Sequence, residues 1–175
     1  MGGEPLSNRA VLRAATVYAA AEAAARGVEA GFSITTNGTL LRPDDADFFE
    51  QYGFAVTVSL DGLPEQHNRL RPFKGGKGSF ERIMERLPPL LERQRRMQVS
   101  ARVTVTPFNL QLAESLEYFV AMGFHSVGFS PLLRAPNGED ELGQERMEEM
   151  LEGMIACGLA FERHVLRGQD RKSVV

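Results

Sequence analysis

The chain has 175 residues, of which 43% are apolar and 25% are charged, and its formal net charge is −3. These values favour one folded domain over an intrinsically disordered chain. The negative net charge argues against a nucleic-acid partner held by bulk positive charge, and no apolar run reaches the roughly 20 residues that a membrane helix needs. The single cysteine, Cys157, excludes an intrachain disulfide and indicates a reducing, cytoplasmic location.

Helical and extended patterns alternate in the first third of the chain. Gly27 and Gly53 each follow a helical run, where glycine readily takes the left-handed conformation that ends a helix. Pro43 stands where a first helical residue is expected. In chain order, the patterns predict a helix at 8–26, a strand at 31–36, a helix at 43–52 and a strand at 54–60.

The alternation continues after a loop rich in glycine and arginine, which is expected at 61–78. Ser79 and Asn109 are predicted to cap the next two helices, because their side chains can accept from first-turn amides. Pro88-Pro89 must kink or split the first of them, since proline lacks an amide donor. The remaining predicted elements are a helix at 79–97, a strand at 99–106, a helix at 109–123, a strand at 125–130, a polar loop at 134–143 and a long helix at about 144–166.

This order of strands and helices predicts an α/β fold with a parallel sheet and right-handed crossovers. An open doubly wound sheet and a β/α barrel both fit the pattern. In either architecture, ligands bind at the carboxyl ends of the strands. We therefore expect the functional residues directly after the predicted strands.

Small and polar residues gather at these expected strand ends. Paired glycines allow a backbone to approach a ligand closely, and Glu4 beside them can accept from a ligand ammonium group. Ser59 and Asp61 can hydrogen-bond hydroxyls or an amine, although Asp-Gly alone is typical of a plain turn. Arg71, in the loop that follows, can hold a carboxylate through a forked contact, or it can be a solvated loop residue.

Within residues 1–133, several short motifs occur together in a characteristic order. The first three are Gly-Gly-Glu-Pro-Leu, Ser-Ile-Thr-Thr-Asn-Gly-Thr-Leu-Leu and Val-Ser-Leu-Asp-Gly. Then come Arg-x-Arg-Pro with Gly-Lys-Gly-Ser-Phe, Ala-Arg-Val-Thr-Val-Thr, and Gly-Phe-x-x-Val-Gly-Phe-Ser-Pro-Leu. Together they resemble the radical S-adenosylmethionine (SAM) superfamily, and within it the SPASM-type peptide and protein maturases such as anaerobic sulfatase-maturating enzymes.

The resemblance implies a parallel, partial (β/α)6 barrel that is incomplete here and runs from about the second to the sixth strand. It assigns residues 1–133 to this core, and 134–175 to a loop and long helix that begin a C-terminal extension. It further implies that SAM and a 4Fe–4S cluster produce a 5′-deoxyadenosyl radical, which modifies a peptide or protein substrate. Neither a nucleic acid nor a membrane is an expected partner.

The resemblance also implies roles for residues at the strand ends. Gly2, Gly3 and Glu4 would meet the methionine amino group of SAM. Arg71 would pair with the SAM carboxylate. These four residues are the expected binding site for the amino-acid end of the cofactor.

Further SAM contacts are implied for Ser59, at the ribose or the methionyl end, and for Leu132, at the adenine through backbone and packing. Thr36 and Asn37 are additional candidates at the same rim. The chain departs from the family in one respect, because the family binds the cluster through Cys-x-x-x-Cys-x-x-Cys and Cys157 is the only thiol here. The cluster ligands are therefore expected outside this chain.

These features suggest the middle of a longer enzyme, truncated at both ends and inactive on its own. A second hypothesis is a non-catalytic α/β module that keeps a rim for SAM or a nucleoside. A third is an ordinary β/α enzyme that uses Glu4, Asp61 or His67 as acid and base groups, but no paired base and nucleophile supports it.

Overall fold

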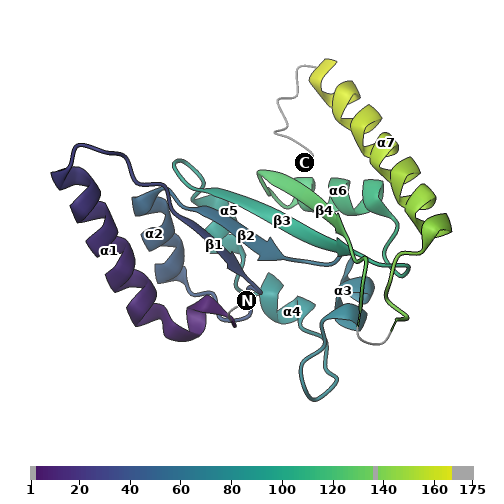
Figure 1. Ribbon diagram of the computed structural model, residues 1–175, viewed down its shortest axis with the longest axis horizontal. Coiled ribbons are helices and arrows are strands. Elements are labelled where there is room, and N and C mark those ends of the chain that lie inside the picture. The colour runs from purple at the N-terminus through teal and green to yellow at the C-terminus, as the bar shows by residue number, and fades with distance from the viewer. Residues whose placement is uncertain (1–2, 136–137, 167–175) are drawn as a thin grey trace.

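A parallel sheet forms the centre of the computed structural model, which describes residues 3–135 and 138–166 (Figure 1). The sheet has four strands, and their spatial order is their order in the chain. They are β1 (Ser33–Thr36), β2 (Ala55–Ser59), β3 (Gln98–Val105) and β4 (Ser126–Pro131). Each neighbouring pair is parallel, which confirms the predicted α/β architecture and the four predicted strands.

Helices occupy the segments before, between and after the strands. The predicted helix ends at Pro43 and Gly53 are confirmed, with Gly53 in the left-handed conformation. The proline pair splits the next helical region in two, as expected. The helices are the 3-10 helix η1 (Pro5–Asn8), α1 (Arg9–Ala25), α2 (Pro43–Tyr52), α3 (Pro64–Leu70), α4 (Phe80–Met84), α5 (Pro88–Glu92), α6 (Leu112–Ala121) and α7 (Gln144–Leu166).

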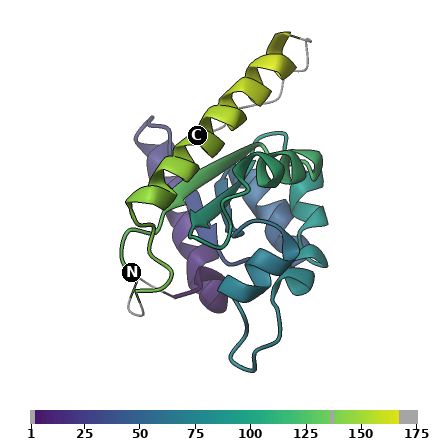
Figure 2. The ribbon, with the colours of Figure 1, turned by 90° about the vertical axis from the view of Figure 1, so that its right-hand side faces the viewer.

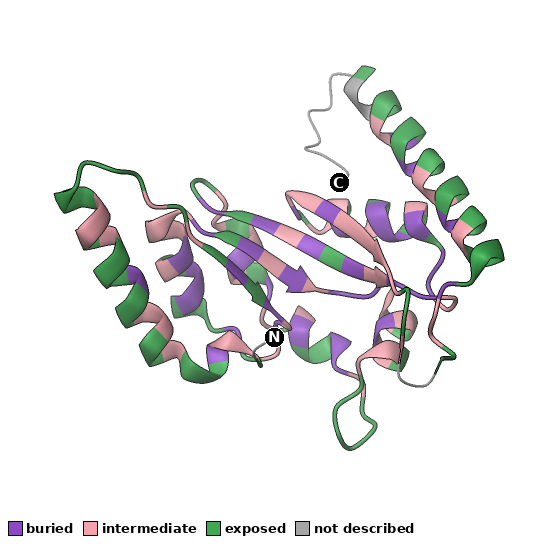
Figure 3. Ribbon diagram, in the orientation of Figure 1, coloured by how far each residue is buried: buried purple, intermediate pink, exposed green. Residues whose placement is uncertain are grey.

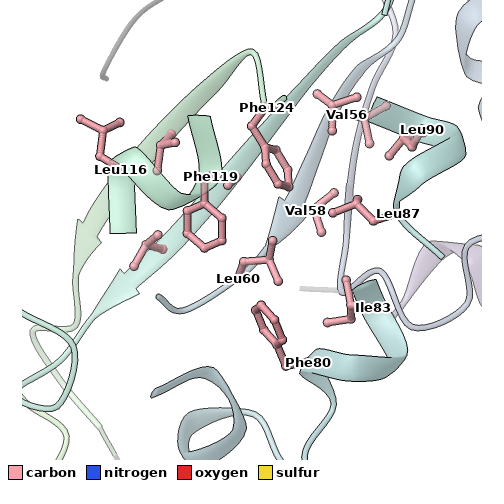
Figure 4. Packing of buried hydrophobic residues seen from close by; sticks show 14 of the residues in the cluster. Val56, Val58, Leu60, Phe80, Ile83, Leu87, Leu90, Leu116, Phe119 and Phe124 are labelled. Atoms are coloured by element: carbon pink, nitrogen blue, oxygen red, sulfur yellow. The ribbon is translucent and has the colours of Figure 1, made fainter. Parts of the chain in front are cut away.

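The hydrophobic core lies between one face of the sheet and the helices α4, α5 and α6. Val58 of β2 lies beside Leu87, and Phe119 of α6 lies beside Phe124, and all four are buried (Figure 4). Burying one such side chain contributes roughly 1.5–3 kcal/mol, so this layer supplies much of the stability. Strand residues alternate between buried and more exposed positions, which leaves the other face of the sheet accessible (Figure 3).

Helix α7 packs against α6 through its inner side and extends beyond the sheet (Figure 2). A side chain at Gly153 would come within 3.2 Å of Leu112, so the glycine permits this close approach. Cys157 is buried on the same side, and burial raises the pKa of its thiol. None of the helices in the described ranges is both long and apolar enough to cross a membrane.

Three local predictions were wrong. The segment expected to be a loop at 61–78 contains helix α3. Ser79 makes no capping bond, because its hydroxyl donates to the carbonyl oxygen of Arg71 at 2.6 Å. Asn109 does not cap α6, which begins at Leu112 instead. In both cases the polar side chain bonds a distant backbone group rather than the helix start.

Gly38 sits in a left-handed turn directly after β1, with a φ of 78°. An added Cβ would lie 2.9 Å from Ile83 and 3.3 Å from Val58, both core residues. We expect Gly38→Ala to lower the free energy of unfolding by about 2 kcal/mol, through backbone strain and core displacement. Gly76 is the matched control, because its φ is 77° and no atom lies within 4 Å of its added Cβ.

Urea denaturation of both variants measures this difference. Gly76→Ala reports the backbone strain alone, about 1 kcal/mol. An equal loss of stability in the two variants would show that the packing around Gly38 contributes nothing.

Candidate functional site

The carboxylate of Glu4 joins the N-terminal segment to the carboxyl end of β1. Its Oε1 accepts from the Thr36 hydroxyl at 2.6 Å and from the amide of Leu6 at 3.1 Å. Its Oε2 accepts from the amide of Asn37 at 2.7 Å. Thr36 also accepts from the amide of Gly38, which fixes the turn after the strand. The structure thus brings together Glu4, Thr36 and Asn37, three residues that the sequence placed at the site.

Glu4 retains one unused acceptor position. A carboxylate oxygen can accept two hydrogen bonds, and Oε2 accepts only one from the described residues. Gly3 lies next to it with no heavy atom within 4 Å of an added Cβ, so this part of the rim is open. Gly2, the third predicted residue, lies outside the described residues. This corner can therefore receive one ligand N–H donor, such as an ammonium group.

A second cluster follows β2, where Asp61 is buried. Its Oδ2 pairs with Nε of Arg71 at 2.5 Å, and its Oδ1 accepts from the amide of Thr104 at 2.9 Å. Arg71 also approaches the Thr104 hydroxyl through Nη2, at 3.4 Å. Nη1 of Arg71 has no partner in the described part of the chain. One edge of the guanidinium is therefore held by Asp61, and the remaining donors can bind an anion.

The side chain of His67 holds the segment that carries Arg71. Nδ1 of His67 accepts from the amide of Asp61 at 3.1 Å, so Nε2 carries the proton and donates to the Ser79 hydroxyl at 3.0 Å. The Ser79 hydroxyl in turn donates to the carbonyl oxygen of Arg71 at 2.6 Å. Burial lowers the pKa of His67 to about 4, so the ring is neutral near pH 7. His67 is a structural residue, not an acid or base of the site.

Asn109 ties the ends of β2 and β3 together. Its amide group donates to the carbonyl of Asp61 at 3.2 Å and to that of Thr104 at 2.9 Å. Its Oδ1 accepts from the amide of Thr106 at 2.7 Å. Sequence reasoning missed this role and that of His67. The polar spacing Thr106-x-x-Asn109, typical of a side-chain-stabilised turn, was the available signal.

Ser59 and Leu132 also lie at the carboxyl edge, at or beyond the ends of β2 and β4. No hydrogen bond in the described ranges links either side chain to Glu4 or Arg71. The backbone of Leu132 is already engaged, because its amide donates to Val105 and its carbonyl accepts from Leu142, both at 2.9 Å. The carbonyl oxygen keeps a second acceptor position, so this oxygen and the half-buried side chain are both available to a ligand.

The described residues contain no group of three or more His, Cys, Asp or Glu side chains that could hold a metal ion. A 4Fe–4S cluster in this family needs three thiolates, and the chain has one cysteine, which is buried on the side of α7 that faces α6. The residues of this chain therefore do not fit the cluster. They do present an acceptor at Glu4 and donors at Arg71 along one edge, which suits the charged groups of an amino acid.

Comparisons with known proteins agree with this architecture. The chain is 31% identical over 134 residues to a serine-type anaerobic sulfatase-maturating enzyme of Bacteroides thetaiotaomicron, an alignment that covers 75% of this chain and 32% of that protein. The fold matches the structure of a histidine-tagged anSMEcpe with bound AdoMet, with a TM-score of 0.80 at 20% identity over 98% of this chain and 45% of the other. It also matches "Native anSMEcpe with bound AdoMet and Cp18Cys peptide", with a TM-score of 0.69 at 20% identity over 84% of this chain and 41% of the other.

The chain spans about a third of the length of this curated relative and less than half of either matched structure. Members of the radical SAM superfamily use SAM together with a 4Fe–4S cluster. The family model of this superfamily matches residues 1–119, which include the Glu4 corner and the Asp61–Arg71 pair. On this match and the parallel sheet beneath it, the chain belongs to the radical SAM superfamily.

Proposed function

We propose that this chain is the SAM-binding part of a radical SAM enzyme that modifies a residue of a peptide or protein. The observation that carries the proposal is the pairing of a free acceptor on Glu4 with free donors on Arg71 at one edge of the sheet. The amino-acid end of SAM carries an ammonium and a carboxylate, which match these two groups in charge. The similarity to SAM-bound and peptide-bound relatives supports both the cofactor and the substrate class.

In this proposal each residue has a defined part. Oε2 of Glu4 accepts from the SAM ammonium, and Gly3, together with Gly2, lets the backbone come close. The outer edge of Arg71 binds the SAM carboxylate, and Ser59 hydrogen-bonds the ribose or methionyl end. Leu132 covers the adenine.

The hydrogen bonds of three of these residues support a more specific proposal for their roles. Thr36 and Asn37 act through Glu4, because both donate to its carboxylate and orient it. Leu132 contacts the adenine by packing of its side chain and through its carbonyl oxygen, because its amide is paired and the carbonyl keeps one acceptor position.

When bound, the 4Fe–4S cluster of this superfamily would supply one electron for the cleavage of SAM into methionine and a 5′-deoxyadenosyl radical. The residues of this chain do not fit the cluster, so we assign no step of that chemistry to them. Their contribution is to bind SAM and to fix its orientation. This follows a general pattern, in which the cofactor carries the chemistry and the protein positions it.

We assign residues 1–133 to the radical SAM core and 134–175 to the start of a further segment. The boundary falls after Leu133, where the polar loop before α7 begins. We also assign the enzyme to the cytoplasm, because a 4Fe–4S cluster and a free thiol suit a reducing compartment.

Isothermal titration of the 175-residue chain with SAM tests the proposal. We expect binding by the unaltered chain, and about tenfold weaker binding by Glu4→Gln, because a charge-assisted hydrogen bond is lost. Glu29→Gln is the matched control, since it removes the same charge from an exposed residue before β1. A Glu4→Gln variant that folds, as judged by its melting temperature, and binds SAM with unchanged affinity would remove Glu4 from the site.

A further inference from the structure

The face of the sheet that points away from α4, α5 and α6 carries a group of hydroxyl side chains. The register aligns Thr57, Ser100 and Ser126 in one row across three strands. These residues help to line a hollow of about 350 Å³ on this face. Hydroxyl side chains can bind many ligands, but they carry no charge that would select among them.

Arg102 is the one charged residue among the strand positions of this face. In the register it lies between Ser59 on β2 and Gly128 on β4, and Gly128 leaves room because it has no side chain. Arg102 also lines the hollow. Thr104, which contacts Arg71, follows two residues later on the same face, so Arg102 lies roughly 6–7 Å deeper along the strand than the rim.

The guanidinium of Arg102 has no anionic partner in the described part of the chain. Its only hydrogen bond there is a long one, from Nη2 to the Ser130 hydroxyl at 3.4 Å. The carboxylates of the rim are engaged elsewhere, since Asp61 pairs with Arg71 and Glu4 binds three donors at β1 and η1. Other arginines of the protein, such as Arg9 and Arg93, do have carboxylate partners.

We propose that Arg102 binds a carboxylate of the peptide substrate, so that the enzyme selects a segment with an aspartate or glutamate near the modified residue. A guanidinium suits this task because its planar donors match both oxygens of a carboxylate. The surrounding hydroxyl groups can donate further hydrogen bonds to the carboxylate. They are neutral, so they do not form an ion pair with Arg102 in its place. The inference rests on the proposed function, which makes the substrate a peptide or protein. It adds that this substrate carries an acidic residue.

A nuclear magnetic resonance titration of the full 175-residue chain tests this, with the side-chain Nε–H signal of Arg102 as the reporter. The probes are two blocked tripeptides, acetyl-Ala-Asp-Ala-amide and acetyl-Ala-Asn-Ala-amide, which differ only in one charge. We expect the aspartate peptide to shift the Arg102 signal and to bind about fivefold more tightly than the asparagine peptide, as for a charge-assisted contact at an exposed arginine.

Three variants complete the test. Arg102→Gln should abolish the difference between the two peptides, and Arg102→Lys should keep part of it because the charge remains. Arg95→Gln should leave it unchanged, since Arg95 is an exposed arginine in the turn before β3. Equal binding of the two peptides, or a preference that survives Arg102→Gln, would overturn the proposal.

SAM also carries a carboxylate, so it is titrated separately into the unaltered chain and into Arg102→Gln. We expect Arg102→Gln to bind SAM with unchanged affinity, because the rim residues hold that group. A loss of SAM binding in this variant, with no discrimination between the peptides, would assign Arg102 to the cofactor and overturn the substrate role. Failure of SAM to bind any form of the chain would instead contradict the proposed function. The peptide titrations contain no SAM, so their result tests the role of Arg102 independently.

Discussion

Replacing Arg71 by alanine is expected to weaken the binding of SAM by about 1–3 kcal/mol, because the SAM carboxylate loses its charge-assisted partner. Arg71→Lys should recover only part of this loss, since an ammonium group cannot bind Asp61 and a ligand through separate edges, as a guanidinium can. Calorimetric titration with SAM measures both effects.

The same substitution also removes the partner of Asp61, whose side chain is only 5% exposed. Leaving a buried carboxylate unpaired is costly, so we expect Arg71→Ala to lower the melting temperature as well. Arg69→Ala is the control, because Arg69 carries the same charge two residues earlier but stacks on Phe108, at 3.6 Å from the ring centre. If Arg71→Ala folds and binds SAM as tightly as Arg69→Ala does, Arg71 plays no part in binding.

Acidification is expected to destabilise the protein through His67. Burial lowers the pKa of this side chain from 6.5 to about 4 in the folded state. Between these two values the unfolded chain binds a proton that the folded chain does not, so the free energy of unfolding falls as the pH falls. The shift corresponds to a loss of about 3 kcal/mol, which is absent above pH 6.5 and complete below about pH 4.

Urea denaturation as a function of pH measures this effect. His67→Asn should reduce the slope between pH 6.5 and 4, although it also removes the bond to Ser79 and lowers stability at neutral pH. A slope that is the same in the unaltered chain and in His67→Asn would show that His67 is not buried as a neutral ring.

Glu50 titrates in a different range and can be separated from His67. Burial acts to raise the pKa of Glu50, but the amides of Met97, Arg96 and Arg95 outweigh it and lower the pKa. The stabilisation from this carboxylate is therefore present above its ordinary value of 4.5 and is lost as the pH falls further. Between about pH 4.5 and 6.5, the change in the free energy of unfolding therefore comes from His67 and not from Glu50.

The fold could be predicted from the sequence because its signals are local. Pro43 and Gly53 mark the ends of α2 through backbone conformations that only nearby residues determine. The proline pair at 88–89 likewise divides α4 from α5 without any help from tertiary structure. Alternation of apolar and polar residues predicts the four strands for the same reason.

The sequence predicts candidate site residues at the strand ends, but it does not predict several of their hydrogen-bond partners. Glu4 was expected to face a ligand, yet three of its acceptor positions bind Leu6, Thr36 and Asn37. For Asp61 the sequence permits both a plain turn and a ligand contact, because its partner Arg71 lies ten residues away, beyond a helix that the sequence did not reveal. Such pairings depend on how the whole sheet is assembled.

Asn109 illustrates the same limit. A polar residue shortly before an apolar helix is a good cap by local rules. Its side chain instead turns back to the carbonyls of Asp61 and Thr104, because buried carbonyl oxygens at two strand ends also need donors. Asn109 can reach both carbonyl oxygens only because β2 lies beside β3 in the sheet.

The most direct test of the account is a crystal structure of the chain grown with SAM. We expect the methionine ammonium within hydrogen-bond distance of Oε2 of Glu4, the carboxylate against the outer edge of Arg71, and the adenine beside Leu132. SAM bound at the amino ends of the strands, or bound at the carboxyl edge without contact to either Glu4 or Arg71, would contradict the proposed site.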